Sequence, residues 1–293
     1  MPLRADVIMP IRNGARFIAP ALQSILADET LGTLIIIDDG STDNWEYAAG
    51  GLLGAPNVMV LRQQPTGVAA SLNRGLAAST STYVARMDAD DISLAGRLSA
   101  QIAYLDRHPH ILAVGTQASF IDAAGRETGK SDYPCTPASL RHTLFSRGTC
   151  AVVHPSIMMR RKPIMEMGGY REAIAHAEDY DLWLRLSETN AVANMPDVHF
   201  KYRIHPDQVS QSTKLPQSFY RDLALFSARE RAAGRADPAA TWTMPPTRRD
   251  AQRHDHPTCR DLGLAHEAIA QFRARASFVP DANLVPVMRA CRR

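Results

Sequence analysis

The stretch Thr-Tyr-Val-Ala-Arg-Met-Asp-Ala-Asp-Asp, residues 82–91, joins a short apolar run to three acidic residues. The apolar run predicts a buried strand, and the acidic cluster follows its carboxyl end. Alternate residues of an extended segment point to the same side, so Asp88 and Asp90 can share one target. Carboxylate oxygens suit Mg²⁺ or Mn²⁺, which commonly join one or two carboxylates to a substrate diphosphate. The alternative is an acidic turn that caps a helix after Asp91.

Strands and helices alternate through the first 85 residues. Apolar runs predict strands at residues 7–9, 34–37, 58–61 and 82–85, and helical spacing predicts helices at residues 16–27 and 68–78. This alternation indicates a parallel sheet covered by helices on both faces. Ligands bind such sheets outside the carboxyl ends of the strands. Pro10, Asp38–Asp39 and Asp88–Asp90 all lie at such ends, so we expect them to converge on one crevice.

A second acidic cluster, Asp38–Asp43, ends the strand at residues 34–37. Gly40 permits a tight turn, and Ser41, Thr42 or Asp43 can cap the following helix. That structural explanation does not require two carboxylates at the start of the cluster. We therefore predict that Asp39 accepts a hydrogen bond from a nucleobase N–H.

The third acidic cluster, Glu178–Asp181, precedes a run with helical periodicity. Asp179 shares a stripe with Leu182, Trp183 and Leu186, at the i, i+3, i+4, i+7 spacing. Asp181 aligns with Leu184, Arg185 and Glu188, a face that we expect to be solvated. Asp179 therefore heads the buried stripe, and a carboxylate at the mouth of a pocket can act as a general base. The alternative is a helix N-terminus enriched in acids, which explains Glu178 and Asp181 better than Asp179.

The bulk composition limits the class of protein. The chain has 293 residues, is 45% hydrophobic and carries a formal charge of +3, too little for nucleic acid to be its main partner. From Asp237 onward nine arginines face six acids, so the tail holds the whole excess charge. This tail is either a solvated appendage or a contact with an anionic membrane surface. Four scattered cysteines, an early polar N-terminus and short apolar runs favour a reducing cytoplasm, with peripheral contact at the inner face of the membrane as the further option.

Six segments together resemble the family 2 glycosyltransferases, which have the GT-A fold. They are Val-Ile-Met-Pro-Ile-Arg-Asn (7–13), Ile-Ile-Asp-Asp-Gly-Ser-Thr-Asp (36–43), Gly67–Asn73, Ala-Arg-Met-Asp-Ala-Asp-Asp (85–91), Glu178–Asp179 and Tyr-Arg-Ile-His (202–205). No single segment is decisive, but their ordered set is specific. Ile11 departs from the family, because many members have an aromatic residue there that stacks on the base. The region after about Gly234 matches nothing in the family.

The resemblance implies an inverting enzyme that moves a sugar from a nucleoside diphosphate, with UDP favoured, to a glycan or lipid-linked acceptor. It implies Mn²⁺ or Mg²⁺ as cofactor and a role in polysaccharide or glycolipid synthesis. The implied catalytic residues are Asp179, as base, and Glu178. The implied metal ligands are Asp88, Asp90 and His205. The implied nucleotide-binding residues are Pro10, Arg12, Asn13, Asp38, Asp39, Gly67, Asn73 and Asp88.

The predicted fold is α/β: a GT-A, Rossmann-like, mainly parallel sheet flanked by helices, followed by a helical or irregular C-terminal appendage. We expect a glycosyltransferase domain at residues 1–215, with a nucleotide-binding half at 1–115 and an acceptor-side half at 116–215, and the appendage at 216–293. A rival is a sugar-phosphate nucleotidyltransferase, which needs a richer phosphate loop than Pro10–Gly14. A second rival is a non-catalytic sugar-nucleotide-binding relative, against which the intact Asp88, Asp90 and Asp179 argue.

Overall fold

The computed structural model describes residues 4–206, 208, 214–253, 255 and 259–267. Its contacts divide the chain into two compact units, one made of residues 1–171 and 178–212 and the other of residues 172–177 and 213–293. The domain boundary expected at 215/216, and the two halves expected on either side of residue 115, stay predictions.

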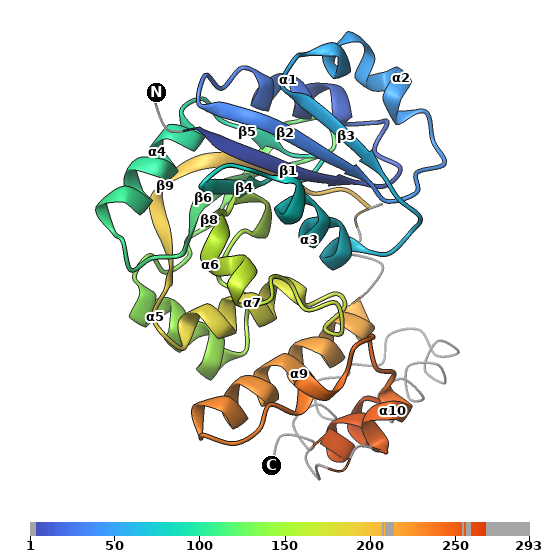
Figure 1. The fold of residues 1–293 in the computed structure, drawn as a ribbon, viewed down its shortest axis with the longest axis vertical. Helices are drawn as coiled ribbons and strands as arrows, with labels where there is room; N and C mark the ends of the chain where they lie inside the picture. The colour runs from blue at the N-terminus through green and yellow to red at the C-terminus, as the bar shows by residue number, and fades with distance from the viewer. Residues whose placement is uncertain (1–3, 207, 209–213, 254, 256–258, 268–293) are drawn as a thin grey trace. The chain divides into compact units, whose positions relative to one another are not determined.

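One sheet runs through the first unit, in the strand order β3-β2-β1-β4-β8-β6-β9-β5, with β7 paired to β6 (Figure 1). The predicted parallel sheet is confirmed for its first four strands, since β1 pairs in parallel with both β2 and β4, and β2 with β3. The bounds of these strands are β1 Ala5–Ile11, β2 Leu31–Asp38, β3 Val58–Arg62 and β4 Tyr83–Arg86.

The second half of the sheet is mixed. β8 is antiparallel to both β4 and β6, whereas β6 and β9 are parallel, and β5 and β7 add antiparallel edges. The bounds of these strands are β5 Ile92–Ser93, β6 Ala113–Ile121, β7 Glu127–Lys130, β8 Met158–Arg160 and β9 Val192–Arg203.

Helices bury both faces of the parallel strands. On one face, Val7 and Met9 of β1 share a core cluster with residues of α1 and α4. On the other face, Ile8 packs so closely on α3 that a Cβ added at Gly75 would lie 2.5 Å from its Cγ2, so only glycine fits there. Figure 1 shows α1 and α3 on opposite sides of β1 and β2. The helices are α1 Ile18–Leu26, α2 Trp45–Ala49, α3 Val68–Ala78, α4 Arg97–Arg107, α5 Pro137–His142, α6 Arg161–Glu166 and α7 Glu178–Ser187.

The second unit is mostly helical where the structure describes it. It contains α9 Lys214–Ala232, α10 Arg248–Gln252 and a helical segment at residues 259–267. Phe219 and Leu223 of α9 are buried, and the α10 N-terminus is closed by a capping box between Thr247 and Asp250. In the described part of the chain, no helix has both the length and the apolarity that a membrane crossing requires.

Candidate active site

The acidic cluster after β4 brings three carboxylates together. Asp88, Asp90 and Asp91 each offer an oxygen, and these oxygens all lie within 4.8 Å of one another. The Asp90 Oδ2 atom is also 2.9 Å from Nε2 of His205, which follows β9 and is 115 residues away in sequence. The structure thus places the three predicted metal ligands, Asp88, Asp90 and His205, side by side.

The electrostatics of this cluster fit a divalent cation. Burial raises the pKa of Asp91 well above its usual range, and the negative charge of the neighbouring Asp90 is the second largest cause of this shift. Burial also raises the pKa of Asp88 to about 6, even though the Arg86 guanidinium opposes the shift. The Asp91 Oδ1 atom accepts the Arg203 backbone N–H at 2.7 Å, but Oδ2 is buried and has no hydrogen-bond partner within the described residues. Mutually repelling carboxylates with an unsatisfied buried oxygen are what a hard cation would stabilise.

The acidic pair after β2 anchors two loops. Asp38 accepts the Ser41 N–H at 2.9 Å and the Trp45 Nε1–H at 3.2 Å. Asp39 accepts the backbone N–H groups of Thr66 at 2.8 Å and Gly67 at 2.9 Å. Burial acts to raise the pKa of Asp39, but these donors and Gln63 outweigh it and lower that pKa. Asp39 is therefore an ionised anchor for the loop before α3, and its predicted contact with a nucleobase stays a prediction.

The loop after β1 is fastened to the loop after β2. The Asn13 side-chain oxygen accepts the backbone N–H groups of Thr42 at 2.8 Å and Asp43 at 3.3 Å, while its own backbone N–H donates to Ser41 Oγ at 3.0 Å. Asn13 has φ +56°, a left-handed conformation that asparagine tolerates. Its neighbour Arg12 is exposed and Pro10 is half-buried. Their nucleotide contacts stay predictions, and the structure gives Asn13 a loop-fixing role.

Gly67 and Asn73 also have structural roles. Gly67 precedes α3 at φ +95°, a conformation that favours glycine. The Asn73 side chain exchanges two hydrogen bonds with the Tyr170 backbone, donating to its C=O at 2.8 Å and accepting its N–H at 2.9 Å. Asn73 therefore ties α3 to the segment after α6, and its predicted nucleotide contact stays a prediction.

At the N-terminus of α7 lie the two acids predicted for catalysis. The Asp179 Oδ1 atom accepts the Tyr180 N–H at 2.6 Å, and Oδ2 lies 3.9 Å from Cys150 Sγ. The Asp179 side chain is 25% exposed, so an incoming group can reach it. Burial raises the pKa of Asp179, and burial together with Asp179 raises the pKa of Glu178 to about 7. Raised carboxylate pKa values beside an accessible oxygen are typical of a general base.

The expectation that Asp181 lies on a solvated face is wrong. The Asp181 side chain is 0% exposed and forms ion pairs with Arg171 and Arg185. Its Oδ2 atom accepts from Nε of both arginines at 2.9 Å. A helical wheel compares the polarity of the faces of a single helix and ignores the rest of the protein. Arg171 lies outside α7 and pairs with this carboxylate, so a face that the wheel predicts to be solvated is buried. Asp181 is therefore a structural residue that fixes α7.

We expect Asp181→Ala to lower the free energy of unfolding by about 3–5 kcal/mol, because it leaves two largely buried arginines without their shared partner. Chemical denaturation measures this change. Asp197→Ala is the matched control, since Asp197 is exposed on β9. Equal stability of the two variants would show that the buried ion pairs do not fix α7.

The chain is similar to proteins of a known family. Residues 6–168 match the family described as glycosyl transferase family 2. The chain belongs to this family. It is 34% identical over 215 residues to EpsE of Bacillus subtilis, a protein named as a glycosyltransferase, and the match covers 70% of this chain and 74% of EpsE. It is also 34% identical over 157 residues to AmsE of Erwinia amylovora, named for amylovoran biosynthesis, and covers 58% of that relative.

Solved structures agree on the fold of this family 2 glycosyltransferase. TarS residues 1–349 of S. aureus superpose on it with a TM-score of 0.61 at 16% identity, over 99% of this chain and 79% of TarS. TarS in complex with UDP-GlcNAc superposes with a TM-score of 0.62 at 14% identity, over the same shares of the two chains. The predicted GT-A fold is confirmed. The family match decides against the nucleotidyltransferase rival.

Motif reasoning did not single out Arg86 of this glycosyltransferase. Arg86 ends β4, is 5% exposed and donates to Asp88 Oδ1 at 2.6 Å. Burial acts to lower its pKa, but Asp88, Tyr170, Asp91 and Asp179 outweigh burial and raise it. One buried cation thus interacts both with carboxylates of the Asp88–Asp90–Asp91 cluster and with Asp179 of α7. A lone arginine inside an apolar strand is the signal that could have identified it.

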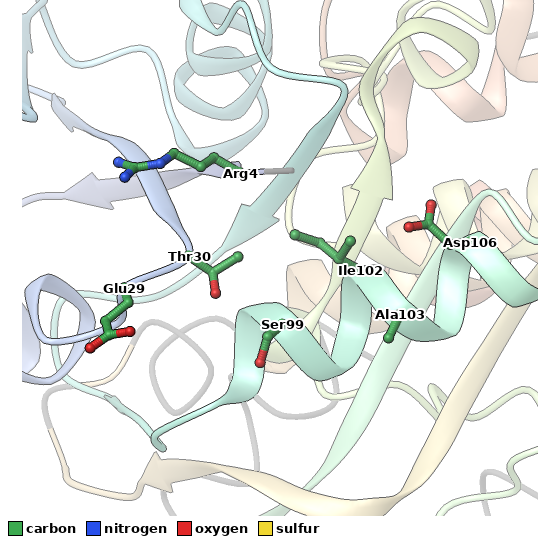
Figure 2. A pocket seen from close by; sticks show the side chains of 7 residues that line it. All are labelled: Arg4, Glu29, Thr30, Ser99, Ile102, Ala103 and Asp106. Carbon is green, nitrogen blue, oxygen red and sulfur yellow. The ribbon is translucent and has the colours of Figure 1, made fainter. Parts of the chain in front are cut away.

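A separate depression of about 420 Å³ lies at the amino ends of β1 and β2. Figure 2 shows Arg4 and Thr30 on one side and Ile102 and Asp106 of α4 on the other. Its lining contains no predicted site residue of the family 2 enzyme. Ligands of parallel α/β sheets bind at the opposite, carboxyl ends of the strands, so this depression is not the candidate active site.

Proposed function

We propose that this glycosyltransferase moves a sugar from a nucleoside-diphosphate donor to an acceptor hydroxyl, with inversion of the anomeric carbon. One observation carries the proposal: the Asp88–Asp90–Asp91 cluster and the accessible Asp179 carboxylate belong to the same unit and flank one buried cation, Arg86. The UDP and UDP-GlcNAc complexes of TarS support a uridine nucleotide donor.

In this proposal, Asp88, Asp90 and His205 hold Mn²⁺ or Mg²⁺. Such an ion supplies positive charge that stabilises the leaving diphosphate. Asp39 and Asn13 keep the loops after β1 and β2 in the conformation that receives the nucleotide. Arg12, Pro10, Asp38, Gly67 and Asn73 are the remaining residues proposed around the nucleotide.

Asp179 acts as the general base. Its carboxylate accepts the proton of the acceptor hydroxyl while the acceptor oxygen forms a bond to the anomeric carbon. The bond from that carbon to the diphosphate oxygen breaks, and the diphosphate leaves with the electron pair. Because the acceptor attacks opposite the leaving group, a single displacement inverts the anomeric centre. Glu178, buried beside Asp179, is proposed to position the acceptor or a neighbouring loop.

The acceptor is proposed to be a glycan or a lipid-linked sugar in polysaccharide or glycolipid assembly. The names of two relatives support this setting: AmsE, named for amylovoran biosynthesis, and the Escherichia coli protein WbnJ, named for O-antigen biosynthesis. We propose a cytoplasmic location, with the arginine-rich C-terminal region as a contact to the inner face of the membrane. Five of its nine arginines, those from residue 273 onward, lie outside the described residues.

A calorimetric binding screen of UDP-, GDP- and dTDP-sugars in the presence of Mn²⁺ tests the proposal. We expect at least one nucleotide sugar to bind, and the same titration in EDTA to show weaker binding. Asp197→Ala serves as a control that should bind like the wild type. If no nucleotide sugar binds to the folded protein, the proposed function is wrong.

A further inference from the structure

Two buried polar side chains, those of His154 and Tyr170, lie next to one another beside the proposed base, Asp179. Nδ1 of His154 lies 3.8 Å from Asp179 Oδ2, and Nε2 of His154 lies 3.1 Å from the hydroxyl of Tyr170. The His154 side chain is 10% exposed, and its ring packs edge-on against Trp183 of α7 with ring centroids 5.7 Å apart. The mechanism above uses neither His154 nor Tyr170.

The backbone around His154 is firmly held. His154 begins a short 3-10 helix, His154–Ser156, that leads into β8 next to β4. Ser156 donates to the Val153 C=O with both its backbone N–H and its hydroxyl, each at 2.8 Å. The buried Arg97 guanidinium donates to the Pro155 C=O at 3.3 Å. An imidazole on such a fixed turn can orient a neighbouring side chain.

The hydrogen bond to Tyr170 fixes which ring nitrogen carries the proton. Burial lowers the pKa of His154 well below its usual range and raises that of Tyr170, so the imidazole is neutral and the phenol is protonated. The Tyr170 hydroxyl also lies 3.9 Å from Met159 Sδ, but a thioether is a weak acceptor. Because Nε2 of His154 is a stronger acceptor than the thioether, we infer that the hydroxyl donates to Nε2. A neutral imidazole has one N–H, so Nδ1 carries it and faces Asp179.

We propose that His154 is a positioning residue for the reaction, and that its Nδ1–H, held in this tautomer by Tyr170, orients the Asp179 carboxylate and favours its ionised form. This inference rests on the proposed role of Asp179 as base. The present 3.8 Å separation is longer than a hydrogen bond, and catalytic hydrogen bonds often shorten when substrate binds. The arrangement resembles a base oriented by a second group, with the carboxylate as the base.

The other charged or titratable groups that face Asp179 stay unchanged in the test. They are Glu178 from α7, Cys150 from the segment after α5, Arg86 from β4 and Asp88 from the metal cluster. A donor to a carboxylate lowers its pKa, so loss of the Nδ1–H raises the pKa of Asp179. The base must be ionised to act. The acid limb of the kcat profile therefore moves to higher pH when this donor is removed.

Two substitutions of His154 distinguish the roles of its two ring nitrogens. In His154→Asn the side-chain NH₂ lies near the position of Nδ1, so a donor toward Asp179 is retained. In His154→Gln the amide reaches the position of Nε2, so contact with Tyr170 is retained and the donor toward Asp179 is lost. Tyr170→Phe removes the hydroxyl that fixes the tautomer. All are measured in the full chain, by release of nucleoside diphosphate from the donor found in the binding screen and by thermal unfolding.

We expect His154→Gln to lower kcat by roughly 10- to 100-fold, as a small misplacement of a catalytic group does, with the KM for the donor little changed. Its acid limb should move to higher pH, whereas His154→Asn should keep the wild-type limb and most of kcat. Tyr170→Phe should fall between them. Equal losses in His154→Asn and His154→Gln with an unmoved acid limb would overturn the inference. If the histidine variants fail to fold, Tyr170→Phe decides the question. Full activity of Tyr170→Phe, with the acid limb of its kcat profile at the wild-type pH, would also overturn the inference. An active Asp179→Asn would instead refute the proposed base itself.

Discussion

Asp179→Asn is expected to slow sugar transfer by about 10²–10⁴-fold, the usual contribution of a positioned general base. Asparagine keeps the size of the side chain and can still accept the Tyr180 N–H, but it cannot accept the proton of the acceptor. The base acts in the transition state, so the affinity for the nucleotide-sugar donor should change little. Transfer rate and donor affinity, measured on the same folded protein, check both parts.

Glu178→Gln and Asp197→Asn are the comparisons for this variant. Glu178 is buried beside Asp179, and burial together with Asp179 raises its pKa, so its loss should have an intermediate effect. Asp197 is exposed on β9 and should be neutral. If Glu178→Gln abolishes transfer while Asp179→Asn remains active, the base has been assigned to the wrong acid.

Asp90→Ala is expected to remove the dependence of transfer on a divalent metal and to slow transfer by about 10²-fold, since metal stabilisation of the leaving group is worth several kcal/mol. Asp90 is chosen because it is in contact with His205 and with the carboxylate cluster, whereas Asp88 also pairs with the buried Arg86. The wild type should lose activity in EDTA, and Asp90→Ala should be slow with or without EDTA.

Thermal unfolding must show that Asp90→Ala is folded. Removing one of three crowded carboxylates relieves repulsion but also removes the contact with His205, so its stability should stay close to that of the wild type without metal. A folded Asp90→Ala protein with full, metal-stimulated activity would contradict the assignment of the ion to this cluster.

The sequence predicts the parallel half of the sheet well, because apolar runs and the polar residues that end them are local signals. Asp38 and Asp88 end strands that pair on either side of β1, so their convergence follows from the parallel order. The antiparallel insertion of β8 between β4 and β6 was not predictable, since strand partners are set by tertiary packing rather than by a run such as Met158–Arg160.

The contacts that these side chains make within the chain were less predictable than their positions. Asp38 and Asn13 lie at strand ends as expected, yet their oxygens bind Trp45, Ser41 and Thr42 of the chain itself. Sequence reasoning could not know these partners. Asp181 and Arg86 show the same limit, because the burial of each depends on residues from other elements. His205 was found only through the family resemblance, since nothing local relates it to Asp90.

The anomeric configuration of the released sugar tests the central claim most directly. Proton NMR can follow the slow transfer to water from an α-linked UDP-sugar, before the free sugar equilibrates between anomers. If Asp179 activates the acceptor for a single displacement, the first sugar signal is the β-anomer, and Asp179→Asn suppresses its appearance. A first-formed α-anomer, or unchanged β-anomer formation by folded Asp179→Asn, would contradict the account.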